Sequence, residues 1–253
     1  MEYYTLSKAE RARLLIEIYN NILADIQNKT TEKILLYFND NDTYIRKAAY
    51  LNIGKIFLRH NALAITTIAL LHKLFLSDEY KIRQTVINAA GEIGKKDFAM
   101  VKVFFDTALF DKHHAVRNAV IGSIEKMSEK NPQPVLFWAQ KYLHHPDKEI
   151  RREICHGIEL RGRKYPQDIL PMLQQLQFDT TARVRNTLVH VIGQIAYKKG
   201  CLQTVIEHLN NWENKILVAQ AIEEIIDVHY RYRNFATLTQ KQAEEYIKQN
   251  YKN

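Results

Sequence analysis

The sequence predicts an all-α protein built from stacked helical repeats, and three observations lead to this fold class. Glycine and proline are scarce, with 8 Gly and 5 Pro in 253 residues, whereas sandwiches and phosphate-binding α/β folds need many turn residues. One short motif recurs along the chain at a nearly constant interval. The residues after each copy follow a helical apolar pattern. We therefore expect an α-α superhelix of about six helical repeats with terminal capping helices, forming one domain over residues 1–253.

The repeated motif is an acidic residue, a few polar residues, and then Ile-Arg or Val-Arg. Its arginines are 37, 34, 34 and 34 residues apart. The residue before each arginine, and those three, four and seven positions after it, are small or apolar, with Tyr50 the largest, and lie on one helix face. Such a regular polar residue indicates a structural role, so we expect a ladder in which each arginine pairs with an acid of the neighbouring repeat. The five arginines are Arg46, Arg83, Arg117, Arg151 and Arg185.

The remaining elements follow from apolar segments and capping residues. Ser7 is expected to start a capping helix over 7–28, and Thr239 with Gln242 forms a capping box that opens a last helix over 239–250. Segments 62–76, 134–143 and 168–176 are each long enough for the first helix of a pair. The sixth repeat keeps the apolar pattern but has no arginine, which is typical of a terminal repeat. The repeats are expected at 29–60, 61–95, 96–130, 131–164, 165–199 and 200–230, giving about fourteen helices.

The motif of Asp followed by Ile-Arg or Val-Arg, placed at the start of a second helix, resembles the HEAT repeat, one of the armadillo-like folds. Tetratricopeptide repeats have a similar period, but their Trp, Leu-Gly, Tyr and Pro positions are absent here. The resemblance to HEAT repeats covers nearly the whole chain. It implies a curved superhelix in which the second helices line the concave face.

Binding residues are expected beside the core face, one, five and eight positions after each arginine, because a helix turns these positions toward the concavity. Asn, Gln, His and Arg in these columns suit hydrogen bonding to phosphates or to a polypeptide backbone, although a merely solvated groove would carry similar residues. The first column is Lys47, Gln84, Asn118, Arg152 and Asn186; the second is Leu51, Asn88, Gly122, His156 and His190; the third is Gly54, Gly91, Glu125, Glu159 and Gly193.

Histidine and glutamate gather in the middle repeats. His156 and Glu159 are three residues apart, His190 is equivalent to His156 in the next repeat, and Glu125 is equivalent to Glu159 in the previous one. Such a cluster could hold a metal ion or provide a general base. No HExxH or other ligand spacing accompanies it. The sequence therefore predicts no metal and no cofactor.

The net charge of +8 favours a polyanionic or acidic partner. Basic residues follow the fourth, fifth and sixth second helices, so stacking would align them along one rim, where they could follow the phosphates of a duplex. Neighbouring tyrosines could pack against sugars or bases. Favourable contact with helix C-termini explains part of the same pattern. The rim residues are Arg161, Arg163, Lys164, Lys198, Lys199, Arg231 and Arg233.

Residues 150–166, with similar stretches at 184–196 and 243–251, resemble bacterial HEAT-like alkylpurine DNA glycosylases, the DNA alkylation repair family. The resemblance implies a basic concave groove that holds DNA by its backbone, with aromatic and carboxylate groups near a damaged nucleotide. This chain departs from family members with a tryptophan-lined cleft, because Trp138 and Trp212 have no neighbouring catalytic Asp. If glycosylase chemistry is present, Glu125 and Glu159 are the expected catalytic carboxylates. The sequence leaves open whether the chain is an enzyme.

Three function classes follow. The first is a DNA-binding protein that resembles alkylation repair enzymes, and the alternative is a non-catalytic scaffold whose columns bind an acidic protein partner. The third is a metal-dependent enzyme centred on His156, Glu159 and His190. A continuous positive band would favour DNA, and a groove of mixed charge would favour the scaffold. The expected nucleic-acid-binding residues are Arg152, His156, Asn186 and His190 together with the seven rim residues named above.

The sequence also bears on compartment. Cys155 and Cys201 cannot form a disulfide framework for a chain of this length. The N-terminus lacks the features of a secretory signal, and no run of about 18 apolar residues could span a bilayer. We expect a soluble, cytoplasmic protein with no membrane partner.

Overall fold

The computed structural model describes residues 3–252, and within this range it contains fifteen α-helices, two short 3₁₀ segments and no strand. The all-α prediction is confirmed. The chain forms two compact units, residues 1–131 and 132–253, and each is described by itself. The prediction of one domain over 1–253 stays a prediction. Among the described residues, no helix has both the length and the apolar character that crossing a membrane requires.

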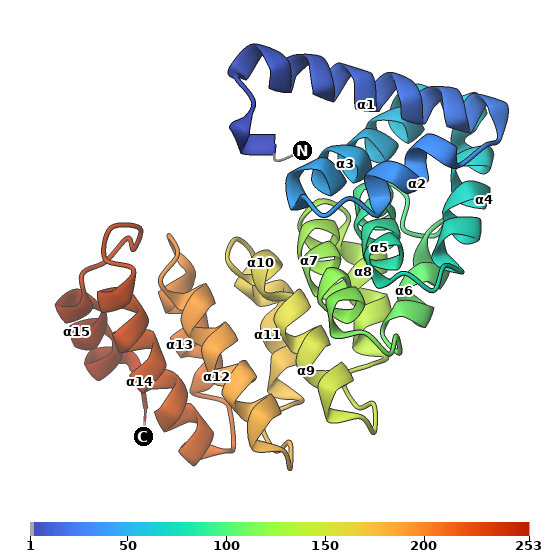
Figure 1. Ribbon diagram of the computed structural model, residues 1–253. Helices are drawn as coiled ribbons and strands as arrows, with labels where there is room; N and C mark the ends of the chain where they lie inside the picture. The colour runs from blue at the N-terminus through green and yellow to red at the C-terminus, as the bar shows by residue number, and fades with distance from the viewer. Residues whose placement is uncertain (1–2, 253) are drawn as a thin grey trace. The chain divides into compact units, whose positions relative to one another are not determined.

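The first unit consists of a capping helix followed by three helix pairs. In each pair the second helix carries the repeated arginine. The second helices α3, α5 and α7 pack against one another in sequence order, as Figure 1 shows in blue to green. The bounds are η1 Tyr3–Thr5, α1 Lys8–Asn28, α2 Glu32–Phe38, α3 Thr43–Arg59, η2 Asn61–Leu63, α4 Ala64–Phe75, α5 Tyr80–Gly94, α6 Lys102–Ala108 and α7 His114–Lys130.

The second unit has the same plan in reverse, with three helix pairs followed by a capping helix. Its second helices α9, α12 and α14 also pack in order, with α12 in the middle (Figure 1). The fourth second helix is interrupted at Ile158, so its last turns form the separate helix α10. The bounds are α8 Pro132–Gln140, α9 Lys148–Gly157, α10 Glu159–Gly162, α11 Pro166–Gln174, α12 Ala182–Ala196, α13 Cys201–Leu209, α14 Lys215–Arg231 and α15 Gln240–Asn250.

The terminal helices begin as their capping residues predict. The Ser7 hydroxyl accepts from the Glu10 amide, and the Glu10 carboxylate accepts from the Ser7 amide. Thr239 and Gln242 make the same reciprocal pair at the start of α15. Both capping boxes satisfy amide groups that a helix N-terminus leaves without intrahelical partners.

The core lies along the apolar face that the periodicity predicts. Nearly all residues at the four apolar positions around each arginine are buried. Tyr50 and Val189 are the two that remain partly exposed. Trp138 is 1% exposed and belongs to this core. Hydrophobic burial along one face of each second helix therefore holds the pairs together.

Each repeat arginine fixes the loop that leads into its own helix. In all five repeats the guanidinium Nη1 donates to the backbone carbonyl six residues earlier, at 2.5 to 2.8 Å. A buried or half-buried loop carbonyl needs such a partner because the helix cannot supply one. The motif arginine is thus a structural residue in every copy.

The predicted ladder between repeats is present at two steps. Arg83 donates from Nε and Nη2 to the Asp111 carboxylate, at 2.7 and 3.0 Å. Arg151 makes the same two hydrogen bonds to Asp179, at 2.5 and 3.0 Å. The equivalent step from Arg117 leads 28 residues along the sequence to a histidine, so no carboxylate occupies that position.

The acids of the motif therefore have two different tasks. Asp42 and Asp147, four residues before their arginines, are N-caps that accept from the backbone of the helix they precede. Asp111 and Asp179, six residues before theirs, receive the arginine of the previous repeat. Burial acts to raise the pKa of Asp111, but hydrogen bonds from Arg83 and from the backbone outweigh it and hold that pKa below its usual value.

Replacing the ladder acid should destabilise the protein measurably. Asp111→Asn leaves the 9% exposed Arg83 side chain without its carboxylate, and we expect the free energy of unfolding to fall by about 2 kcal/mol. The wild-type advantage should be complete above about pH 4 and shrink below it, because the folded-state pKa is the lower one. Urea unfolding followed by circular dichroism measures both.

Asp106→Asn is the matched control in the same unit. Asp106 pairs with Lys102 on the helix surface, where both side chains are partly exposed, so its loss should cost about 0.5 kcal/mol or less. Equal effects of the two substitutions would contradict a structural role for the ladder.

Candidate functional site

The first two predicted columns line a hollow in each unit. In residues 1–131 a hollow of about 310 Å³ includes Lys47 and Gln84 of the first column and Asn88 of the second. In residues 132–253 a hollow of about 510 Å³ includes both column residues of two successive repeats. These last four are Arg152, Asn186, His156 and His190. The same sequence positions therefore border open space in both units, beside adjacent second helices.

Three residues at or beside the second hollow were missed by sequence reasoning. Arg183 and Thr187 line it, and Glu149 holds both Arg152 and Arg183 by ion pairs of 3.0 and 3.2 Å. The signal was present in the spacing, because residues 183, 186, 187 and 190 lie on one helix face. Positions counted one, five and eight residues after the motif arginine do not include these three residues.

The third column was wrongly predicted to face open space at its glycines. Gly54, Gly91 and Gly193 are buried, because the next second helix packs directly against each of them. A Cβ atom at Gly91 would lie 2.5 Å from the Ser123 Oγ. A Cβ at Gly193 would lie 2.6 Å from a Glu224 side-chain carbon. Small residues here allow close helix packing, and the column belongs to the interface between repeats.

The two predicted catalytic carboxylates of that column have different surroundings. Glu125 is half-buried on α7, in the first unit. Glu159 is 2% exposed at the start of α10, in the second. Its Oε1 pairs with Arg163, and Arg163 also donates to the Gln194 side-chain oxygen at 2.9 Å. The structure therefore gives Glu159 a fixed orientation, and the catalytic role of both residues stays a prediction.

Two histidines face the buried Glu159 carboxylate. The Nε2 atoms of His156 and His190 lie 3.6 and 4.0 Å from its Oε2. Burial lowers the pKa of His156, and the neighbouring Glu159 charge acts in the opposite direction without cancelling that shift. On the other side of His190, Nδ1 lies 3.6 Å from the Glu224 carboxylate. The sequence predicted the grouping of the two histidines with Glu159 but not the part of Glu224, because the sixth repeat lacks the arginine from which positions were counted.

Several rim arginines are neutralised by nearby acids. Arg161 donates twice to Asp168, at 2.7 and 2.5 Å, and lies over the Tyr165 ring. Arg231 pairs with Glu224 and Asp227, each at 2.5 Å. With Arg163 held by Glu159, three of the seven rim residues share their charge with a carboxylate.

The other rim residues are more available. Lys164, Lys199 and Arg233 are exposed, and Lys198 is partly exposed above the Tyr197 ring. The excess of basic residues is not confined to this rim, because residues 132–253 hold 17 Lys and Arg against 13 Asp and Glu, leaving half of the net charge in the first unit. The surface of the second unit therefore carries both basic and acidic side chains, and exposed cations remain at its rim.

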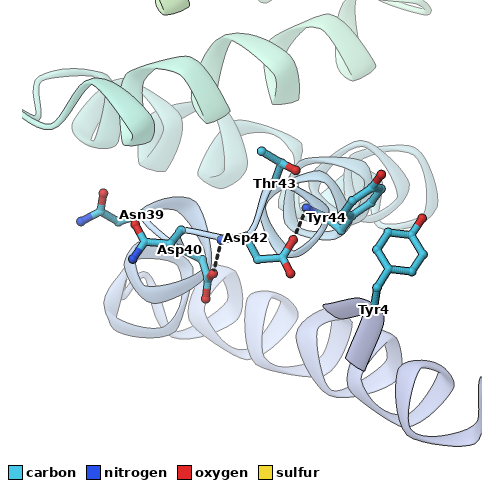
Figure 2. Close-up of a pocket in the computed structure, with 7 residues that line it drawn as sticks. Tyr4, Asn39, Asp40, Asp42, Thr43 and Tyr44 are labelled. Carbon is cyan, nitrogen blue, oxygen red and sulfur yellow. Dashed lines mark hydrogen bonds between the residues drawn. The ribbon is translucent and has the colours of Figure 1, made fainter. Parts of the chain in front are cut away.

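Another hollow of the first unit is formed by the loop before α3. Figure 2 shows Tyr4 and the loop residues around a space of about 610 Å³. Its carboxylates accept hydrogen bonds from the backbone: Asp40 accepts from the Asp42 amide, and Asp42 accepts from the Tyr44 amide (Figure 2). Asp42 also accepts from the Tyr3 amide. These contacts give the loop its shape and explain why two acids occur together there.

Each unit stacks helix pairs, and in five of the six pairs of the described chain an arginine fixes the loop before the second helix, which is a HEAT-like α-solenoid architecture. No family model and no curated protein matches its sequence. Solved structures with similarity include AlkD2 from Streptococcus mutans, at 15% identity and a TM-score of 0.48, covering 83% of this chain and 94% of that one. Another is the smu.31 protein of Streptococcus mutans UA159, at 17% identity and 0.48, covering 87% and 96%.

A computationally designed armadillo repeat protein for modular peptide recognition is a third similar structure, at 16% identity and a TM-score of 0.34, covering 78% of this chain and 98% of that one. The helix pairs and arginine contacts of this chain define its fold.

The close packing at the third column can be tested with two glycines of adjacent helices. Gly91→Ala should lower the free energy of unfolding by about 1–3 kcal/mol, as expected for overpacking, because the added methyl meets Ser123. A methyl group added at Gly122 would have no described atom within 4 Å, so Gly122→Ala should be neutral or stabilising by up to about 1 kcal/mol. Thermal and urea unfolding of both variants give the comparison, and destabilisation of both would contradict the assignment of the two columns.

Proposed function

We propose that this chain is a non-catalytic binding protein whose first two columns hold an extended, acidic polypeptide segment. The observation that carries the proposal is the pair of hollows lined by the same column positions in both units. Exposed or half-exposed side chains that can hydrogen bond to a peptide backbone recur there, among them Gln84, Asn186 and His190.

The spacing of the repeats suits an extended chain. Packed helices lie about 8–10 Å apart, and three residues of an extended peptide rise about 10 Å. One polar side chain per repeat can therefore meet every third peptide group of a ligand that runs across successive second helices. An amide side chain both donates and accepts, which matches the backbone N–H and C=O.

The charges beside the second hollow suit an acidic peptide better than a DNA duplex. The arginines beside the second hollow, Arg152 and Arg183, both contact Glu149, which reduces their attraction for closely spaced phosphates. Arg183 nevertheless keeps a 65% exposed side chain, and Lys47 borders the first hollow. Separate cations of this kind suit the separate carboxylates of an acidic peptide.

A labelled acidic probe peptide of alternating Ser and Glu, about ten residues and so about 33 Å long, tests this function by fluorescence anisotropy. Asn186→Ala should weaken its binding about fivefold, as for loss of one hydrogen bond of about 1 kcal/mol. The matched control is Asn211→Ala, an exposed asparagine of the same unit outside the columns, which should bind like wild type. No binding of the acidic probe, or equal binding of a Ser-Lys peptide, would reject the proposal.

DNA binding is the second candidate function, and the exposed rim cations favour it. Lys164, Lys199 and Arg233 follow the ends of successive second helices, and Tyr230 and Tyr232 lie beside Arg233 in the chain. Backbone binding of this kind is sequence-independent and strongly dependent on salt. The catalytic roles predicted for Glu125 and Glu159 belong to this candidate and stay predictions.

If the rim binds a duplex, the double substitution Lys198→Ala with Lys199→Ala should lower the slope of log K against log salt by about 2, one for each lost phosphate contact. Lys148→Ala with Lys215→Ala removes two lysines from the starts of second helices, at the ends opposite the rim, and should leave the slope unchanged. Absence of duplex binding at low salt would exclude this candidate without affecting the peptide proposal.

A further inference from the structure

Three side chains of the second unit converge on one point between α9, α10 and α12. One donor atom from each of His156, Glu159 and His190 can be chosen so that all three lie within 4.8 Å of one another. The two Nε2 atoms lie 3.6 and 4.0 Å from the same carboxylate oxygen, Glu159 Oε2. Two imidazoles and one carboxylate are a common protein ligand set for zinc.

The buried oxygen between the histidines has no hydrogen-bond donor in the part of the chain that the structure describes. Glu159 Oε2 is inaccessible to solvent and receives no hydrogen bond from these residues, whereas Oε1 of the same carboxylate is held by Arg163. Buried carboxylate oxygens normally have partners, because leaving one without a partner costs free energy. This oxygen therefore has a lone pair of fixed orientation that is available to coordinate a cation.

The surroundings of the second ring nitrogen of His190 also suit metal binding. Its Nδ1 faces Glu224 Oε1 at 3.6 Å, and Arg231 holds that carboxylate at 2.5 Å. A carboxylate beside Nδ1 favours the tautomer that carries its proton there and leaves the Nε2 lone pair directed toward Glu159. Metal-binding histidines are typically oriented by such a carboxylate on their second nitrogen.

The site is accessible, and its dimensions suit a small metal ion. Both histidines line the hollow of about 510 Å³, so an ion can enter and an additional ligand can reach it. Zinc ligands at about 2.0–2.2 Å in a tetrahedron lie about 3.4 Å from one another. Side-chain rotations of the two partly exposed histidines are sufficient to close the remaining distance, while Glu159 stays fixed.

We propose that His156, Glu159 and His190 bind one divalent transition-metal ion of the zinc class, with a fourth coordination position open to the hollow. The sequence predicted no metal because its local spacing matches no known ligand motif. The third ligand comes from the next repeat, 31 residues after Glu159, and repeat stacking brings it to the other two.

Cobalt(II) and zinc(II) titrations of the full chain, purified and then treated with chelator, test the site. Cobalt should give the visible absorption of a four-coordinate ion with one equivalent bound per chain, and zinc should displace it. His190→Ala should reduce the affinity for zinc at least about tenfold, and Glu224→Gln should reduce it about 10–100-fold, as expected when the group orienting a ligand is lost. His190 is partly exposed, so its replacement should leave the helical circular dichroism unchanged.

His114→Ala is the matched control, because His114 is an exposed histidine at the start of α7 and should bind zinc like wild type. Glu159→Gln provides a second test at a buried position, where circular dichroism must first show an intact fold. The proposal is overturned if the wild-type chain binds no metal, or if His190→Ala binds as tightly as wild type. The peptide and DNA assays are run in chelator, so their outcome does not depend on this one.

Discussion

The contact between each motif arginine and the loop carbonyl six residues before it is the constraint on which the rest of this structure depends. It recurs in all five copies, and it fixes the direction in which each second helix leaves its loop. Because a helix is rigid over its length, fixing its start also fixes which of its residues face the core, the neighbouring repeat and the solvent. In the five repeats that carry the motif, the columns are therefore set by one guanidinium each.

Close packing between second helices decides how much of each column remains available for binding. Where a glycine occupies the third column, the next helix approaches until its side chain lies over the glycine backbone, and the column is covered. Where Glu159 occupies it, the carboxylate is buried instead and must be held by Arg163. Beside these residues the accessible surface belongs to the first two columns, and the hollows of both units lie there.

Mutual pairing of charges shapes the chemistry of that surface. Acids at Glu149, Glu159 and Glu224 each contact two or more basic or histidine side chains. The lysine and arginine side chains that give the protein its positive charge are consequently less able to bind an anionic partner than their number suggests. Polar side chains without charge, together with a few exposed lysines and arginines, are left to make contacts with a partner. This balance favours a hydrogen-bonded polypeptide over a duplex.

The sequence by itself determined the helix pairs, the capping residues of both terminal helices and the first two columns, because these depend on local periodicity and on residues a few positions apart. It also grouped His156, Glu159 and His190, since the repeat interval makes the two histidine positions equivalent and Glu159 lies three residues after His156. Only the tertiary structure decided that the third column is covered, that the motif acids divide into caps and ladder partners, and that Glu224 and Arg231 complete the surroundings of His190. These facts depend on how closely one helix approaches the next and on which side-chain rotamers then meet, and neither quantity is encoded in the spacing of residues along a single helix.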